Sequence, residues 1–192
     1  SFEPGRWLDP RTARSLGIAH VPEDRHARAM VMSFGAWESA VLGYEELPQY
    51  SRGGWMRHGA MRDATAALMQ RFDVRPRNPS LGSAKFSGGN QQKLVLAREI
   101  GQAPKVLLVG QPTRGVDIGA IEFIHAQLRA LRDAGCALLV VSSELDEILA
   151  LADRVLVMNE GRITGELPIN ECTEAKVGLL MVETVDAERH SA

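Results

Sequence analysis

Residues 86–100 read Phe-Ser-Gly-Gly-Asn-Gln-Gln-Lys-Leu-Val-Leu-Ala-Arg-Glu-Ile, and this stretch decides the fold. Ser87 can cap a helix that continues through the apolar run at residues 94–100. Gly88 and Gly89 lack the Cβ atoms that would block an approaching ligand. The open backbone N–H groups and the positive end of the helix dipole then favour an anion. A simple Ser-Gly-Gly turn without a ligand is the alternative interpretation.

The second half of the chain alternates between strands and helices. Short apolar runs at residues 105–109 and 136–141 are typical of buried parallel strands. Between them, residues 118–134 carry apolar side chains at helical spacing and stop before a glycine. Residues 154–158 and 162–167 then predict two strands joined by a turn. This alternation favours an α/β fold.

The first half has a different pattern. Residues 17–21 predict a short strand, and from there to Arg98 we expect no further strand. Residues 34–42 and 61–72 have helical patterns instead. A helical insert between two parallel strands is the simplest architecture that fits both halves.

Composition excludes several classes of protein. The chain has 192 residues, 45% hydrophobic and 24% charged, close to an ordinary soluble domain. A net charge of −2 gives no basic surplus for binding nucleic acid. Cys136 and Cys172 are the two cysteines, and they form no paired metal-ligand spacing. We therefore expect neither a disulfide framework nor a zinc site.

The stretch at residues 86–100 resembles the signature motif of ABC-transporter ATPases, in the form found in tandem ATPase subunits of bacterial simple-sugar and nucleoside importers. Other segments resemble family landmarks in the family's order. GIAHVPEDR at 17–25 resembles the Q-loop strand, with Glu23 where most members have Gln, and VLLVGQPTRGVD at 106–117 resembles the Walker B strand and D-loop. LLVVSSELDEI at 138–148 resembles the H-loop strand, and DRVLVMNEGRITGEL at 153–167 resembles the hairpin that follows it.

The resemblance covers residues 2 to 181 and implies a P-loop NTPase fold of the ABC type: a parallel sheet with an inserted α-helical subdomain. We expect four segments along the chain. They are the end of an N-terminal part with the Q-loop strand at 1–23, the α-helical subdomain with the signature at 24–98, the α/β core with Walker B, D-loop and H-loop at 99–183, and a tail at 184–192.

The phosphate loop of the family, GxxxxGK[ST], is absent from the sequence. The sequence contains four lysines, and none of them follows a glycine. They are Lys85, Lys93, Lys105 and Lys176. The chain therefore offers no loop that both cradles β- and γ-phosphates and supplies a lysine to them. In the family this loop precedes the Q-loop strand, so we expect the chain to be a fragment of a longer ATPase. The loop's strand lies inside the family's sheet, so its absence predicts exposed strand edges and self-association.

The catalytic positions are also altered. Gly110 and Gln111 stand where the family has Asp and Glu after the Walker B strand, and Ser143 stands in place of the H-loop histidine. Glutamine can hydrogen-bond a water but cannot take its proton. We expect negligible hydrolysis by this chain alone. Gln111 as a plain polar strand end, and Ser143 as a helix N-cap with Asp146, are the simpler interpretations.

In the family, two ATPase domains pack head to tail, and each signature caps the γ-phosphate held by the other domain. The resemblance therefore implies one competent and one degenerate site. Residues binding ATP in trans would be Ser87, Gly88, Gly89 and Gln91. Mg²⁺ would bind only at the partner's site, while Gln111 and Ser143 would lie at the degenerate one. Asp117 occupies the D-loop position and can also cap the helix that follows it. Glu23 is either the Q-loop residue or an ordinary surface acid.

The resemblance implies part of the ATP-binding subunit of an importer for nucleosides or simple sugars, at the cytoplasmic face of the bacterial inner membrane. The expected partners are another ABC ATPase domain, membrane permease subunits and, indirectly, a solute-binding protein, but no nucleic acid. The QPTRGVD variant favours the nucleoside importers. The alternative is a non-transport ABC-type regulatory or scaffold module. An unrelated α/β domain would require four ordered motif matches to be accidental.

Overall fold

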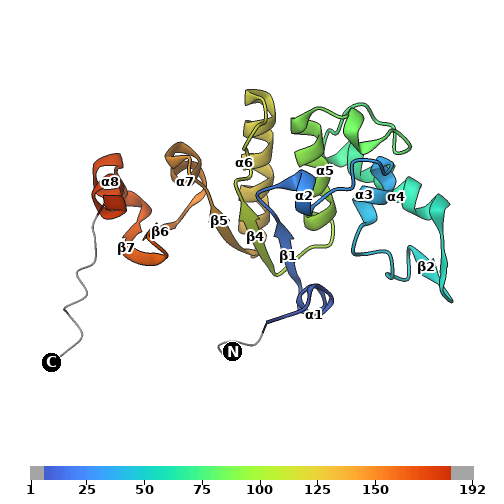
Figure 1. The fold of residues 1–192 in the computed structure, drawn as a ribbon, viewed down its shortest axis with the longest axis horizontal. Helices are drawn as coiled ribbons and strands as arrows, with labels where there is room; N and C mark the ends of the chain where they lie inside the picture. Colours follow the sequence, from blue (N-terminus) through green and yellow to red (C-terminus); the bar gives the residue numbers. More distant parts are fainter. Residues whose placement is uncertain (1–6, 183–192) are drawn as a thin grey trace. The chain divides into compact units, whose positions relative to one another are not determined.

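Three parallel strands form the sheet of the computed structural model, which describes residues 7–182 (Figure 1). They are β1 (Ile18–Val21), β4 (Val106–Gly110) and β5 (Ala137–Val141), in the order β1-β4-β5. Ile18 pairs with Val106, and Val106 with Ala137. The strands expected at residues 17–21, 105–109 and 136–141 are confirmed within one residue at each end.

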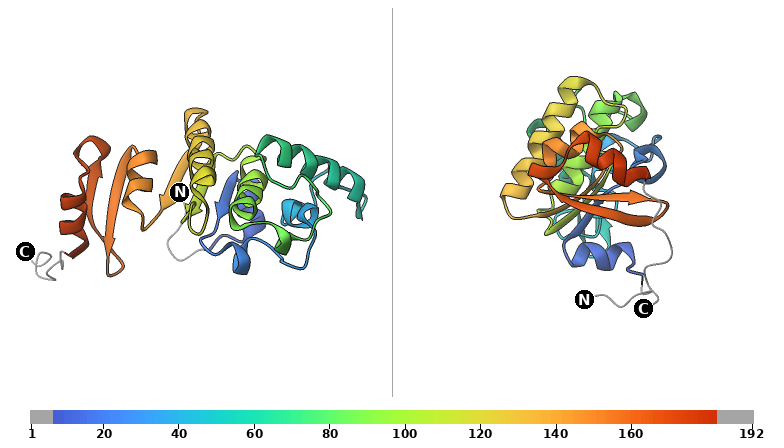
Figure 2. Two further views of the ribbon diagram at one scale, coloured as in Figure 1. Left: turned by 90° about the horizontal axis from the view of Figure 1, so that it is seen from above. Right: turned by 90° about the vertical axis from the view of Figure 1, so that its left-hand side faces the viewer.

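Two long helices pack against this sheet and against each other (Figures 1 and 2). Helix α5 (Gly88–Ile100) contacts β1, and α6 (Ile118–Asp133) contacts β5. Their apolar faces and the central strand supply side chains with almost no exposed surface, among them Leu94, Leu96, Leu107, Ile124 and Leu128. This burial fixes α5, and with it the Ser-Gly-Gly stretch at its start.

The segment between β1 and α5 is mainly helical, as expected. Its elements are α2 (Arg25–Arg28), α3 (Ala36–Val41), β2 (Ser51–Arg52), β3 (Trp55–Met56), α4 (His58–Arg71) and the 3₁₀ turn η1 (Ser83–Lys85), and α1 (Pro10–Ser15) precedes β1. The expectation that no strand lies here was wrong at one point. Strands β2 and β3 form a short antiparallel hairpin, because Gly53 and Gly54 both adopt positive φ at its turn.

The chain divides into two units, residues 1–141 and 142–192. The second contains α7 (Leu145–Leu151), β6 (Arg154–Asn159), β7 (Arg162–Pro168), the 3₁₀ turn η2 (Ile169–Glu171) and α8 (Glu174–Val182). The expected hairpin at residues 154–167 is confirmed as β6 and β7, and α8 packs on β6 through Val155, Val157 and Val177. The expected domain boundaries within residues 1–183 stay predictions, and the tail at 184–192 lies outside the described residues.

One side of β5 pairs with β4, and its other edge pairs with no strand of the three-stranded sheet. Two apolar side chains on this strand are largely exposed, Leu139 at 52% and Val141 at 59%. Such an edge can pair with another chain. In the part of the chain that the structure describes, no helix has the length and apolar character needed to cross a membrane.

Candidate functional site at the start of helix α5

Ser87 is the N-cap of α5, as the sequence predicts. Its hydroxyl oxygen accepts hydrogen bonds from the backbone nitrogen of Asn90 at 3.4 Å and from the Asn90 side-chain nitrogen at 2.9 Å. The side chain is exposed, so the cap faces solvent. Helix geometry leaves the N–H groups of Gly88 and Gly89 without partners inside α5. At the start of α5, the exposed Ser87 hydroxyl therefore stands beside two N–H groups that have no partner inside the helix, on the half-buried Gly88 and the buried Gly89.

Gly88 and Gly89 were expected to leave room for a ligand, but in the structure they leave room for neighbouring parts of the chain. A Cβ atom on Gly88 would lie 2.8 Å from the Gly115 carbonyl oxygen and 2.8 Å from an Arg25 nitrogen. A Cβ on Gly89 would lie 2.9 Å from the Asp117 carboxylate. Both positions point into the protein, so the glycines let residues 111–117, which we call the D-loop segment, approach α5.

Gln91 does not face the surface. Its side chain is 4% exposed, and its amide nitrogen donates to the Ser83 carbonyl oxygen at 3.1 Å. Its oxygen lies 2.8 Å from Nε2 of His26. The side chain thus braces the start of α5 from within and does not point toward a ligand outside. Asn90, which the sequence reasoning did not select, bonds the exposed Ser87 instead.

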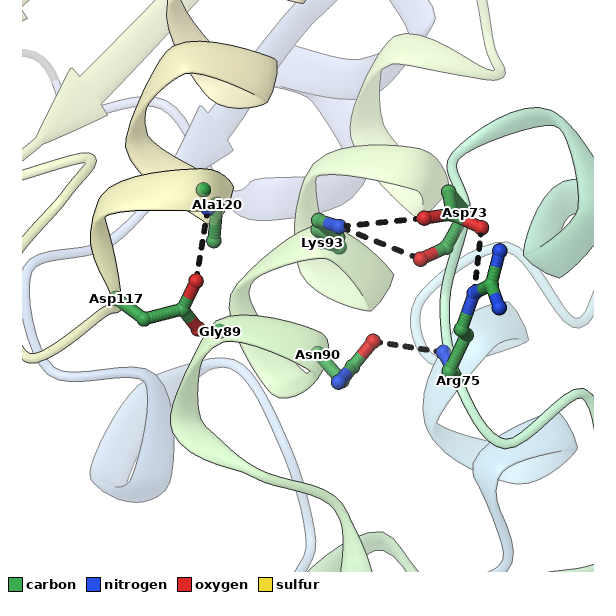
Figure 3. A pocket seen from close by; sticks show the side chains of 8 residues that line it. Asp73, Arg75, Gly89, Asn90, Lys93, Asp117 and Ala120 are labelled. Carbon is green, nitrogen blue, oxygen red and sulfur yellow. Dashed lines mark hydrogen bonds and ion pairs between the residues drawn. The ribbon is translucent and has the colours of Figure 1, made fainter.

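A cavity of about 330 Å³ opens beside Asn90, between the starts of α5 and α6 (Figure 3). It is lined by Asp73, Arg75, Gly89, Asn90, Lys93, Asp117, Gly119 and Ala120. The Arg75 backbone nitrogen donates to Asn90 Oδ1 at 2.6 Å, and Lys93 Nζ donates to the Asp73 carbonyl oxygen at 3.3 Å. The loop at residues 73–75 therefore fastens the start of α5 on its cavity side.

Three charged side chains that line this cavity, Asp73, Arg75 and Lys93, are paired with one another. Arg75 Nε donates to an Asp73 carboxylate oxygen at 2.9 Å, and Lys93 Nζ lies 3.8 Å from the other oxygen. The hydrogen bond from Arg75 is the main cause that lowers the pKa of Asp73. Asp73 is therefore an anion at neutral pH, and it compensates part of the positive charge beside the start of α5.

Asp117 caps α6, which confirms one of its two expected roles. Its Oδ1 accepts from the Ala120 backbone nitrogen at 2.9 Å. Its other oxygen faces Gly89, as the close approach to that glycine requires. The D-loop segment and the start of α5 thus form one continuous surface.

The carboxyl ends of β1 and β4 bring Glu23 close to Gly110 and Gln111. A Cβ on Gly110 would lie 3.1 Å from the Glu23 backbone nitrogen, so an aspartate there would require the backbone to shift. Gln111 adopts a positive φ of 47°, and its N–H donates to the Val141 carbonyl oxygen at 2.7 Å. Glu23 pairs with Arg114 of the D-loop segment. The carboxylate nearest this edge is therefore held by a cation.

Ser143 lies in the second unit and is exposed. Ser143 was expected to be the N-cap of the helix, but α7 begins one residue later than expected. Its N-cap is Glu144, without a side-chain hydrogen bond to the helix. The Ser142 hydroxyl accepts from the Glu144 nitrogen at 3.0 Å and so competes with a cap at Ser143. No cluster of three or more His, Cys, Asp or Glu side chains arranged to hold a metal occurs within residues 7–182.

Comparison with known proteins finds relatives with similar sequences. The guanosine import ATP-binding protein NupO of Bacillus subtilis is 41% identical over 185 residues, which cover 96% of this chain and 36% of that protein. The nucleoside import ATP-binding protein NupA of Lactococcus lactis is 42% identical, with 90% and 34% covered. The xylose import ATP-binding protein XylG of Burkholderia ambifaria is 44% identical, with 88% and 32% covered. The chain matches the ABC-type ATPases of sugar and nucleoside importers.

Solved ABC ATPase structures agree on the fold. An ATP-binding cassette of an ABC transporter superposes with a TM-score of 0.70 at 18% identity, covering 91% of this chain and 72% of that one. A dimeric cassette in a post-hydrolysis state, bound to ADP and phosphate, gives 0.63 at 21% identity, covering 79% and 62%. No protein-family model matches the chain. The ABC ATPase fold expected from the sequence is confirmed, and the chain spans about a third of the length of its curated relatives.

Proposed function

We propose that this chain is part of the ATP-binding subunit of an ABC importer and that it completes, in trans, the nucleotide site of a partner ATPase domain. One observation carries the proposal. An exposed, capped helix start at Ser87 with open N–H groups occurs in a chain whose sequence has no lysine-bearing phosphate loop. The chain can therefore complete an anion site but cannot build one of the usual kind alone.

These residues are suited to binding ATP held by a partner domain and are poorly suited to binding ATP within this chain. In cis, Gly110 and Gln111 supply no carboxylate for Mg²⁺, and the acid nearby, Glu23, is paired with Arg114. In trans, the Ser87 hydroxyl and the N–H groups of Gly88 and Gly89 can bind a phosphate held by the partner. ATP supplies that phosphate group, and Mg²⁺ belongs to the partner's site. Gln91 supports the start of α5 from the protein interior. Asn90, and not Gln91, lies beside the exposed Ser87.

The other half-site is the degenerate one. Gln111 can orient a water but cannot accept its proton, and Ser143 is short and uncharged. We infer that hydrolysis in the assembled importer occurs where the partner holds the phosphates and this chain holds Ser87. Asp117 stands beside Gly89 on the same surface, so the D-loop segment meets the partner together with the signature.

We further propose the biological setting. Several relatives are import ATP-binding proteins for guanosine, nucleosides, ribose or xylose, which supports import of a nucleoside or a simple sugar. The partners would be a second ATPase domain, membrane permease subunits and, indirectly, a solute-binding protein. The place would be the cytoplasmic face of the bacterial inner membrane.

Calorimetric titration of the purified chain with ATP, with and without Mg²⁺, tests the trans assignment. The expected result is no saturable heat at tens of micromolar protein, because nothing in cis cradles the phosphates. Saturable binding near one equivalent would overturn the assignment and would point to another segment, with Gly53 and Gly54 first, as the phosphate site. Inorganic phosphate in place of ATP separates weak anion binding from nucleotide recognition.

A further inference from the structure

Arg25 joins three segments that lie far apart in the sequence. It is the first residue of the short helix α2 and lies two residues after Glu23. Its Nη1 donates to the Arg114 carbonyl oxygen at 3.0 Å, and its Nε lies 3.5 Å from Gln91 Oε1. Its remaining nitrogen, Nη2, faces Gly88 so closely that a Cβ there would lie 2.8 Å away.

We propose that Arg25 is a positioning residue that fixes the signature segment, residues 86–93, and the D-loop segment, residues 111–117, as one rigid surface. The proposal rests on the trans role proposed above, because both segments must meet the partner's nucleotide together. The contacts of Arg25 also connect both segments to the chain that follows β1. Arg25 lies four residues after the end of β1, and it is the side chain of this stretch that bonds both segments. Glu23 reaches the D-loop segment alone, and His26 bonds the signature segment alone.

The chemistry of the side chain suits this task. A guanidinium is planar and presents its N–H groups as a fixed fork, so one side chain reaches acceptors on two segments. A lysine has a single nitrogen at its end and cannot serve both Gln91 and Arg114 in the same geometry. Partial burial between α5 and the D-loop segment strengthens hydrogen bonds from the cation.

Helix α2 provides its own controls. His26, the next residue, reaches Gln91 at 2.8 Å, and its other hydrogen bond is its backbone N–H to Asp24. Its side chain therefore bonds the signature segment and not the D-loop segment. Arg28 is exposed on the same helix and makes no side-chain hydrogen bond within residues 7–182. The three side chains should differ in which segments they hold.

Residue-resolved hydrogen exchange on the full 192-residue chain separates them. The reporters are the Gln91 N–H, bonded to the Ser87 oxygen at 2.9 Å, and the Val116 N–H, bonded to the Thr113 oxygen at 3.2 Å. Arg25→Ala should speed exchange at both reporters by about tenfold, as expected for the loss of a charged hydrogen bond. His26→Ala should speed Gln91 alone, and Arg28→Ala neither. Arg25→Lys should restore at most one reporter.

Other outcomes would overturn the proposal. They are faster exchange at one reporter only in Arg25→Ala, no change at either, or full recovery of both in Arg25→Lys. If Arg25→Ala unfolds the chain, Arg25→Lys with the same two reporters decides, since Lys keeps the charge but not the fork. The measurement needs neither nucleotide nor partner, so its failure leaves the trans assignment standing, and failure of the ATP titration leaves this result standing.

Discussion

Asn90 donates from its side-chain nitrogen to the hydroxyl of Ser87 over 2.9 Å, while its side-chain oxygen accepts from the backbone of Arg75 over 2.6 Å. The N-cap of α5 is therefore held by the helix and by the loop at residues 73–75 at once. In the trans role proposed above, this N-cap would be the surface offered to the partner. Its geometry would then depend on the loop at residues 73–75, which lies outside the signature segment.

Replacing the cap should destabilise the chain measurably. Ser87→Ala removes the acceptor of two hydrogen bonds and should cost about 1 kcal/mol of unfolding free energy. Asn90→Ala should cost a similar amount, because the Arg75 N–H loses its partner. The two residues are in contact, so a double-mutant cycle in urea should show coupling of about 0.5 kcal/mol or more. Strict additivity would mean that the Ser87–Asn90 bond does not form in solution.

Two glycine-to-alanine variants test how closely α5 packs against the D-loop segment. Gly88→Ala places a Cβ against the Gly115 carbonyl oxygen and should cost about 1–3 kcal/mol through overpacking. Gly59→Ala is the matched control, because Gly59 is helical and no atom would lie within 4 Å of its Cβ. The control should unfold at an equal or higher urea concentration, since alanine favours helix. Equal stability of the two variants would show that α5 and the D-loop segment do not pack closely.

A buried ion pair supports the same helix from within. Arg98 and Glu99 have side chains 5% and 3% exposed, with 2.7 Å between them, and the Tyr44 hydroxyl donates to Glu99 at 2.6 Å. Burial, followed by the Glu99 charge, raises the pKa of Tyr44.

Glu99→Ala leaves the Arg98 charge buried without its carboxylate and should cost about 3–5 kcal/mol. Glu46→Ala breaks the exposed pair with Arg11 and should cost no more than about 1 kcal/mol. Urea unfolding of both variants checks the contrast. Similar losses would place the Arg98–Glu99 pair in contact with water.

Acid should loosen the loop that fastens Asn90. The pKa of Asp73 is lowered in the folded chain, so its stabilising contribution is complete above the ordinary value of 3.8 and is lost as the pH falls through the lower folded value. Carboxyl carbon shifts from NMR should therefore show Asp73 titrating below 3.8, and Asp73→Asn should remove this step. Titration above 3.8 would contradict the contacts with Arg75 and Lys93.

The edge of β5 that pairs with no strand among residues 7–182 should make the isolated chain associate with itself. Leu139→Lys places a charge at an exposed position of that edge strand and should shift the chain toward monomer in light-scattering measurements. Leu179→Lys, at an exposed position on α8, is the control and should leave the size unchanged. A clean monomer with a high, reversible melting temperature in the unmodified chain would contradict the prediction.

Local signals predicted much of the fold. Apolar spacing and Gly135 placed α6 at residues 118–134, and the structure has it at Ile118–Asp133. Ser87 was recognised as a cap because capping depends on residues three positions apart. The β2–β3 hairpin was missed because two-residue strands are too short to show alternation.

The site itself depends on contacts that local patterns cannot show. Gln91 was expected to bind ATP in trans, yet its side chain is buried and lies 2.8 Å from His26, 65 positions earlier. Gly88 was explained by ligand access, while the reason in the structure is the approach of Gly115. Asn90 could have been found from the helix start alone, because the third helical residue lies beside the N-cap side chain.

The most direct test mixes this chain with the partner proposed above, a phosphate-loop-bearing ATPase domain held in a form that binds but does not hydrolyse ATP. Association is followed by sedimentation velocity. A complex should form only with ATP, and Ser87→Glu should abolish it because the new carboxylate repels the γ-phosphate. Association without ATP, or a complex that Ser87→Glu leaves intact, would contradict the trans role of this chain.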